Sequence, residues 1–263
     1  MAMKIDRAHV MAEFKNYTDD YDSTDEKVRL KIDHTYRVAE LCERIARSEG
    51  MEEADIELAW LLGMLHDVGR FEQLRRYGTF IDAESIDHAQ LGADILFGEG
   101  DSKEGKIRDY VQGTEEDILI ETAIRVHNRY RVPEDLPART EKLSHILRDA
   151  DKIDILKVNV EVPLEEIYNT TTEELRNAEV SEAVMKSFYE HTATLRDIRQ
   201  TIVDHVVGHI SLVYELVFPE SLRIAKEQGY LDQLMHFESY NPKTREQFAE
   251  LRAEMDRYLA KEQ

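Results

Sequence analysis

The sequence predicts an all-α protein. Apolar residues recur along almost every segment at the spacing that places them on one face of a helix. No segment alternates apolar and polar residues as a half-buried strand does, and no pair of segments has the pattern of a hairpin. Several periodic segments end at or next to a glycine, which commonly follows the last turn of a helix.

The first strongly periodic segment spans residues 28–48 and is expected to end at Gly50. Its apolar side chains fall in one stripe, made of Ile32, Val38, Ala39, Leu41, Cys42, Ile45 and Ala46. The next segment, residues 54–67, is apolar on most sides, which is typical of a central buried helix. Gly69 is expected to act as its C-terminal stop.

Three further helices are expected in the same half of the chain, at residues 88–97, 116–127 and 139–158. Residues 98–116 contain four of the eleven glycines and are predicted to form a mobile loop, either a lid or a plain surface insertion. We therefore expect residues 1–160 to form a core domain that includes an N-terminal helix.

Beyond the core, Pro163 and a run of three threonines mark a change in pattern. Helices are expected near residues 173–178, 181–217, 219–228 and 243–261. The last of these carries a narrow apolar stripe of Phe248, Leu251, Met255 and Tyr258. This stripe suits packing on the core or on a second subunit, so a homodimer is one expectation. Residues 161–263 are thus predicted to form a C-terminal helical extension packed on the core.

The composition limits the partners. The chain has 55 acidic and 34 basic residues, and its net charge is -21. Such a field opposes binding to nucleic acid or anionic membrane, although a small anionic substrate remains compatible with it if basic residues cluster locally. The single cysteine, Cys42, cannot form an internal disulfide, which fits a reducing compartment. Because no apolar run approaches the roughly 18 residues of a membrane span and no signal peptide is apparent, a cytoplasmic location is expected.

Six side chains are candidates for a metal site. They are His34, His66, Asp67, His88, His127 and Asp151. Four imidazoles and two carboxylates without a thiolate suit Mn, Fe, Co, Ni or Zn, and such mixed sites commonly catalyse hydrolysis.

The adjacent pair His66–Asp67 is the anchor of this set. Neighbouring residues within a helix diverge by about 100°, so they converge on one ion only where the helix unwinds. Taken singly, each candidate also has a structural explanation. His34 fits a hydrogen-bonded core histidine, Asp151 fits a salt bridge with a neighbouring cation, and His88 fits the first turn of a helix.

Three sequence blocks resemble the HD superfamily of metal-dependent phosphohydrolases. The blocks are HTYRVAELCERIA, LLGMLHDVGRF and ILRDADKID, and the resemblance covers residues 28–158. It implies an all-α fold and a divalent metal held by His34, His66, Asp67 and Asp151. His88 and His127 resemble two additional histidines of the binuclear branch, in which the aspartate of the doublet bridges two ions. Two metal ions are therefore expected here.

The chain also departs from known branches of that superfamily. Asn128 follows the last histidine, where cyclic-dinucleotide phosphodiesterases have another histidine and a Gly-Tyr-Pro block. Arg70 and Phe71 stand where alarmone hydrolases carry a Glu-Asp pair. Arg70 also replaces a lysine that often follows the doublet, and its planar fork suits a bidentate phosphate contact.

We therefore expect a phosphohydrolase that cleaves a phosphate ester of a nucleotide or a similar small molecule by metal-activated water, with Asp67, Arg70 and Lys152 in catalytic roles. Candidate phosphate-binding residues are Arg70, Arg75, Arg76, Arg129 and Arg131, although solvated positions paired with acids such as Glu72 explain any one of them as well. The alternatives are a non-catalytic nucleotide-binding regulator on the same scaffold and a purely helical interaction protein. His205 and His209 lie one helical turn apart, but their apolar neighbours favour a structural role over metal binding.

Overall fold

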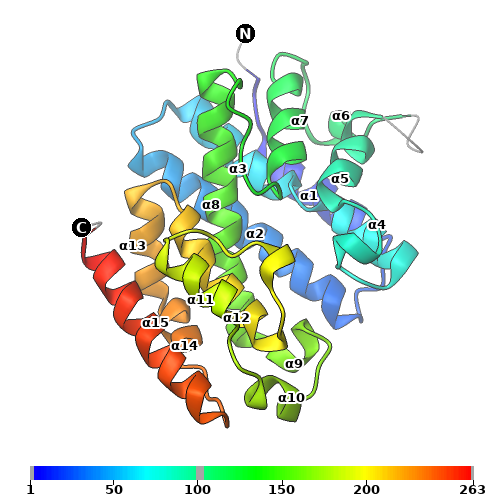
Figure 1. Cartoon of the computed structure of the whole chain (residues 1–263). Helices are drawn as coiled ribbons and strands as arrows, with labels where there is room; N and C mark the ends of the chain where they lie inside the picture. Colours follow the sequence, from blue (N-terminus) through cyan, green and yellow to red (C-terminus); the bar gives the residue numbers. More distant parts are fainter. Residues whose placement is uncertain (1–2, 99–103, 262–263) are drawn as a thin grey trace. The chain divides into compact units, whose positions relative to one another are not determined.

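The computed structural model describes residues 3–98 and 104–261, and within these residues the fold is all-α (Figure 1). The chain divides into two compact units, Met1–Asp151 and Lys152–Gln263. This division falls inside the long helix α8 (Ala138–Glu161), because α8 contributes residues to both units. It lies nearer the N-terminus than the predicted boundary after residue 160.

The first unit is built around a closely packed helix pair. Its helices are α1 (Arg7–Thr18), α2 (Glu26–Ser48), α3 (Glu53–Leu65), α4 (Val68–Tyr77), α5 (His88–Phe97), α6 (Ile107–Tyr110), α7 (Asp117–Val126) and the first part of α8, with a 3-10 turn at Asp82–Glu84. Helices α2 and α3 approach so closely that a Cβ atom on Gly63 would lie 2.5 Å from the Cα of Ala39. Every residue of α3 from Leu58 to Leu65 is buried, as predicted for a central helix.

Gly69 does not end a helix, and that prediction was wrong. Helix α3 ends at Leu65, and Gly69 lies in the first turn of α4. A Cβ atom at this position would be 2.2 Å from the carbonyl oxygen of His88 and 2.6 Å from the amide nitrogen of Gly92. The glycine is required because α4 and α5 cross backbone to backbone, and not because the chain turns there.

The loop predicted at residues 98–116 is irregular in its described part, residues 104–116, apart from the short helix α6. Residues 99–103 lie outside the described residues. Beyond them, α6 forms, and Ile107, Tyr110 and Val111 are each less than 5% exposed. These side chains anchor the middle of the segment by apolar burial, which favours the surface insertion, and the mobility of the segment stays a prediction.

The second unit contains the C-terminal part of α8 and several short helices. They are α9 (Leu164–Ile167), α10 (Thr172–Asn177), α11 (Glu182–Tyr189), α12 (Ile202–Ile210), α13 (Pro219–Gln228), α14 (Tyr230–Met235) and α15 (Pro242–Lys261), with 3-10 turns at Arg196–Ile198 and Ser211–Glu215. A single helix over residues 181–217 was predicted, and this is wrong. His191 has a φ of 53°, and Thr201 and Asp204 form a capping box that starts α12 anew.

The apolar stripe of α15 packs within the second unit. Phe248, Leu251 and Met255 are at most 2% exposed, and Tyr258 lies edge-on against Tyr214 with ring centroids 4.7 Å apart. Helix α15 contacts α11 and α14. The stripe is therefore used inside the unit, and a homodimer stays a prediction.

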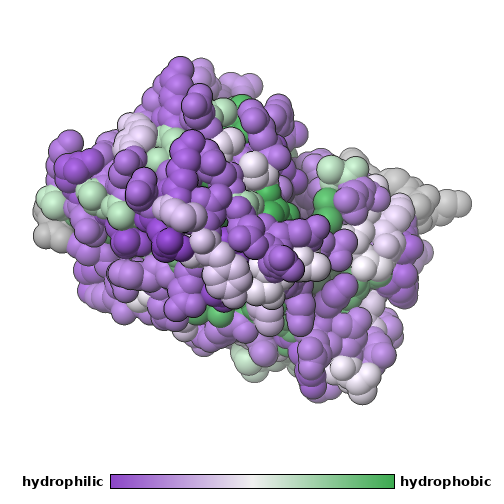
Figure 2. All heavy atoms as spheres, turned by 60° about the horizontal axis from the view of Figure 1, so that its bottom comes forward, coloured by the Kyte–Doolittle hydropathy of each residue, from purple (hydrophilic) through white to green (hydrophobic). Residues whose placement is uncertain are grey.

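The polar surface agrees with the high content of charged residues, and the single cysteine is buried. Hydrophilic residues predominate on the face drawn in Figure 2. No helix in the described ranges has the length and apolarity needed to cross a bilayer. Cys42 is fully buried in α2, and this burial raises the pKa of its thiol well above the usual range.

Candidate metal centre

Asp67 lies in the turn between α3 and α4, with its carboxylate at the centre of the six predicted ligands. Its side chain is 2% exposed and caps no helix, so neither solvent nor the backbone of α4 occupies its oxygens. Oδ2 lies 3.5 Å from Nε2 of His34 and 3.6 Å from Nε2 of His66. Oδ1 lies 3.5 Å from Nε2 of His88 and 3.8 Å from Nε2 of His127. Each carboxylate oxygen thus faces a different pair of imidazoles.

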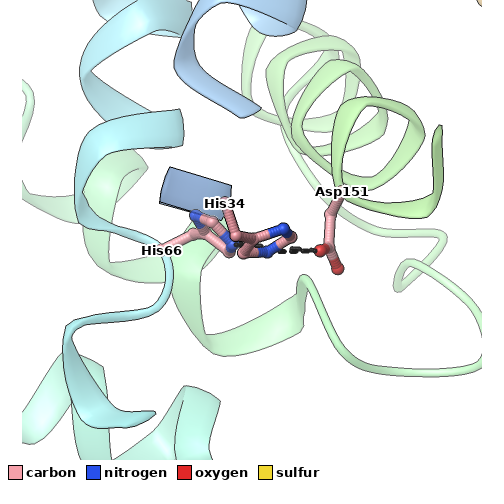
Figure 3. A group of neighbouring side chains, drawn as sticks. All are labelled: His34, His66 and Asp151. Atoms are coloured by element: carbon pink, nitrogen blue, oxygen red, sulfur yellow. Dashed lines mark hydrogen bonds and ion pairs between the residues drawn. The ribbon is translucent and has the colours of Figure 1, made fainter. Parts of the chain in front are cut away.

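Asp151 completes the first of these two groups. Its Oδ1 lies 3.2 Å from Nε2 of His34 and 3.9 Å from Nε2 of His66. Figure 3 shows the two imidazoles, from α2 and the end of α3, directed toward one another and toward the carboxylate on α8. Together with Asp67, this group offers two nitrogens and two carboxylates to one ion.

The histidines are fixed by hydrogen bonds on their outer nitrogens. Nδ1 of His66 donates to the carbonyl oxygen of Gly63 at 2.8 Å, and Nδ1 of His127 donates to that of Ile124 at 2.7 Å. Nδ1 of His88 lies 2.7 Å from a carboxylate oxygen of Asp82. A carbonyl or carboxylate oxygen only accepts, so Nδ1 carries the proton in each ring. The Nε2 lone pairs are thereby directed at Asp67, as in metal-ligating histidines.

The distances between these lone pairs favour cations in the site. Nε2 of His88 and Nε2 of His127 are 3.1 Å apart, and those of His34 and His66 are 3.3 Å apart. His88 and His127 both carry the proton on Nδ1, so their facing Nε2 lone pairs repel unless a positive charge lies near both. The donor set therefore fits divalent transition metal, and the described residues include three groups of the right spacing, His34–His66–Asp151, His66–Asp67–His127 and Asp82–Asp87–His88. In the third group, Asp82 is hydrogen-bonded to Nδ1 of His88, and Asp87 accepts from the amides of Ala89 and Gln90.

The protonation states also suit metal binding. Burial is the main cause that lowers the pKa of His66, and it lowers those of His88 and His127 to about 4. Burial alone would raise the pKa of Asp67, but Lys31 and the adjacent imidazoles hold it well below its usual range. The pKa of Asp151 is also lowered, by His34 and His66 against the effect of burial. At neutral pH His66, His88 and His127 are therefore neutral and Asp67 and Asp151 are ionised, which are the forms that bind metals.

Two residues at the centre were missed in the sequence. Lys31 Nζ lies 2.7 Å from Oδ2 of Asp67 and 5.6 Å from the centre of the Phe80 ring. Asp82, in the 3-10 turn before α5, holds His88. Lys31 precedes His34 by nearly one helical turn, a spacing that places both on the same face of α2, and this signal could have identified it. Asp82 had no comparable signal, because only the folded chain brings it to His88.

Arg70 lies beside the metal centre, but its guanidinium forms hydrogen bonds with the loop that follows α4. Its NH1 donates to the carbonyl oxygen of Phe80 at 2.7 Å, to Asp82 at 3.0 Å and to Gln73 at 2.9 Å. Its Nε lies 3.7 Å from Oδ1 of Asp67. The structure thus gives Arg70 a part in positioning Asp82, and its phosphate contact stays a prediction.

The described contacts of the other predicted phosphate-binding residues do not involve the six predicted metal ligands. Arg75 and Arg76 both pair with Glu72. Arg129 and Arg131 are exposed in the segment after His127, where the Arg131 guanidinium lies over the Tyr130 ring. Their roles, and that of Lys152 next to Asp151, stay predictions.

A comparison with protein-family models identifies the family of the region that contains the metal centre. The model described as HD domain matches residues 32–159, a range that includes all six predicted ligands. Comparisons with curated proteins and with solved structures gave no match. The all-α fold agrees with this assignment. The chain therefore carries, in residues 32–159, an HD domain of the metal-dependent phosphohydrolase superfamily.

Proposed function

We propose that this protein is a phosphohydrolase that uses two divalent transition-metal ions to cleave a phosphate ester of a nucleotide or a similar small molecule. The observation that carries the proposal is the Asp67 carboxylate, whose two oxygens face two separate pairs of imidazoles. Such a carboxylate can bridge two ions. One ion would be held by His34, His66, Asp67 and Asp151, and the other by His88, His127 and Asp67.

When bound, such ions lower the pKa of a coordinated water from about 15.7 towards 7 and stabilise charge on phosphate oxygens. The chain's own residues then have three tasks. The backbone carbonyls of Gly63 and Ile124 hold two of the imidazoles in the ligating tautomer. Asp82 does the same for His88 through its carboxylate. Burial keeps all three imidazoles unprotonated at neutral pH.

The phosphate group is assigned to the cations at the edge of the centre. Lys31 is 17% exposed and Arg70 is 15% exposed, so both reach the centre and border solvent. The charged groups of both also face the ring of Phe80, from 5.6 Å and 5.8 Å, and these cation–π contacts help to orient them. We assign Lys31 the principal contact with nonbridging oxygens, since its ammonium has no acceptor other than Asp67 among the described residues.

The substrate class follows from charge and from the missing motifs. A net charge of -21 disfavours nucleic-acid polymers, which require many phosphate contacts. The single buried thiol of Cys42 supports a cytoplasmic setting. Asn128 and the absence of a Gly-Tyr-Pro block after His127 support a substrate other than a cyclic dinucleotide.

Metal analysis combined with phosphate release tests the proposal. Anaerobically purified protein should contain transition metal, and it should release phosphate from members of a nucleotide panel in the presence of Mn or Fe. The variants His66→Ala and Asp67→Ala should lose both metal and activity, whereas His236→Ala, which removes an exposed histidine of the second unit, should keep both. Full turnover by the first two variants after metal repletion would refute the proposal. A panel that raises the melting temperature without phosphate release would indicate a nucleotide-binding regulator instead.

A further inference from the structure

A second cluster of ionisable side chains belongs to the second unit and shares no residue with the metal centre. It consists of Tyr168, Arg199, His205 and His209, and we call it the Arg199 cluster. His205 and His209 lie on one face of α12, and the ring of Tyr168 lies 5.6 Å from both imidazole centres. Nδ1 of His209 is 2.7 Å from the Tyr168 hydroxyl, and Nδ1 of His205 is 3.4 Å from NH1 of Arg199.

The spacing of the two histidines does not make a metal site here. The guanidinium of Arg199 faces the free nitrogen of His205, and a second cation there would be repelled. The nearest acid along α12, Asp204, accepts instead from the backbone amides of Ser181 and Gln200. Among the described residues no third ligand joins the two imidazoles, and two nitrogens alone are too few for a protein metal site.

The arginines of the cluster form no direct ion pair in the described residues, and the charge of Asp204 acts on Arg199 only from a longer distance. Arg199 donates to the carbonyl oxygen of Thr194 at 2.8 Å and approaches His205, and both are neutral acceptors. Its Nε is buried and has no hydrogen-bond partner. Neither Arg199 nor the neighbouring Arg196 has a carboxylate within 4.0 Å in the described part of the chain. This is unusual in a protein with 55 acidic residues and a net charge of -21.

The guanidinium of Arg199 is held in place by packing. A Cβ atom on Gly208 would lie 2.5 Å from its Cζ, so the planar group lies flat against the backbone of α12. Burial and the charge of Arg196 lower the pKa of the guanidinium. The same two arginines, after burial, lower the pKa of His205 and that of His209, to about 3 for the latter. A preorganised guanidinium without a directly paired carboxylate is an arrangement that can bind an oxyanion.

We propose that Arg199, with Arg196 and His205, forms a binding site for a phosphate group. Arg196 is exposed and the other two side chains are partly exposed, so a small anion can approach from solvent. The fork of a guanidinium matches two phosphate oxygens, and a second arginine matches the dianion. The phosphate group can belong to inorganic phosphate or to a small phosphate monoester.

Phosphate titration of the full-length protein tests this site separately from the metal centre. Metal-free protein is titrated at pH 7 with inorganic phosphate and, in a second arm, with a nucleoside monophosphate, while NMR follows the ring carbon-bound protons of His205. Assignment comes from His205→Gln. We expect saturable shifts of the His205 signals in at least one arm, and the tighter arm identifies the source of the phosphate group.

Two variants complete the test. Arg199→Gln should weaken phosphate binding at His205 about ten-fold or more, because a charge-assisted pair of hydrogen bonds is lost. Arg199→Lys keeps the charge but lacks the paired donors of the guanidinium, so it should bind phosphate with intermediate affinity. This variant replaces Arg199→Gln in the test if the latter fails to fold. Asp67→Asn, at the metal centre, should leave the His205 shifts unchanged. His205 signals that stay fixed in both arms, or an Arg199→Gln variant that folds and binds like wild type, would overturn the proposal.

Discussion

The ammonium of Lys31 lies 2.7 Å from Oδ2 of Asp67, the same oxygen that faces His34 and His66. Lys31 is thus the cation closest to the oxygen that we assign to a metal ion. It stabilises the ionised carboxylate, and under the proposed function it would also be available to the phosphate group once metal is bound.

Replacing Lys31 by methionine should separate substrate binding from metal binding. We expect Lys31→Met to lower kcat/KM by about 10- to 100-fold, because one charged hydrogen bond to phosphate is lost. Its metal content should equal that of wild type, since Lys31 is not a ligand. Lys27→Met removes an exposed lysine one turn earlier on α2 and should change neither value. An equal loss of metal in Lys31→Met would contradict this assignment.

The two proposed ions should be separable by mutation. Asp151 faces only the His34–His66 pair, whereas His127 belongs to the pair that faces Oδ1 of Asp67. Asp151→Asn and His127→Gln should therefore each reduce the metal content from about two ions per chain to about one, as a site of two ions requires. Elemental analysis of both proteins checks this. A single ion in wild type would argue for a mononuclear centre.

Asp82 should act on the metal through His88. Loss of a carboxylate that orients a ligating imidazole typically costs about 10- to 100-fold in metal affinity or activity, and we expect this from Asp82→Ala. Competition with a metal chelator measures the affinity.

Asp87 provides the matched control for Asp82. It accepts from the amides of Ala89 and Gln90 at the start of α5, so Asp87→Ala should lower the free energy of unfolding by about 1 kcal/mol. Its metal affinity should stay close to that of wild type. Equal metal affinities in the Asp82→Ala and Asp87→Ala variants would contradict a role for Asp82 in positioning His88.

Gly69 should be essential for the crossing of α4 and α5. A Cβ atom there meets backbone atoms at 2.2 and 2.6 Å, which cannot move as a flexible side chain does. We expect Gly69→Ala to lower the free energy of unfolding by about 3 kcal/mol, measured with urea. Gly50→Ala should cost only about 1 kcal/mol, since Gly50 has a positive φ but open space around it. Similar losses in both variants would contradict the close-crossing explanation.

Acid should destabilise the second unit through His209. Burial, followed by the charge of Arg199, lowers the pKa of His209 to about 3 in the folded chain, while an unfolded histidine has a pKa of about 6.5. Between these values only the unfolded chain takes up the proton, so stability falls as the pH decreases from about 6.5 towards 3. Urea unfolding at pH 7.5 and 5 should show a smaller loss in His209→Gln than in wild type. An identical pH dependence would show that His209 is protonated in the folded state.

The sequence by itself determined the fold class and the six candidate ligands. Helical periodicity is a local property, so the segments that became α5 and α13 were predicted with their observed bounds. The doublet at residues 66–67 was placed where a helix unwinds, and the structure places His66 and Asp67 between α3 and α4. The single helix predicted over residues 181–217 was wrong because the chain leaves the helical conformation at His191 and starts α12 anew at the capping box of Thr201.

Only the tertiary structure decided which side chains meet. Asp82 holds His88, Arg70 holds Asp82, and Gly69 lies against α5, and none of these contacts is local in sequence. The same holds for Arg199, which follows a 3-10 turn and yet packs against Gly208 on α12. Helix patterns follow from the chain's own periodicity, whereas the partners of a polar group depend on how separate helices pack, and no periodicity encodes that packing.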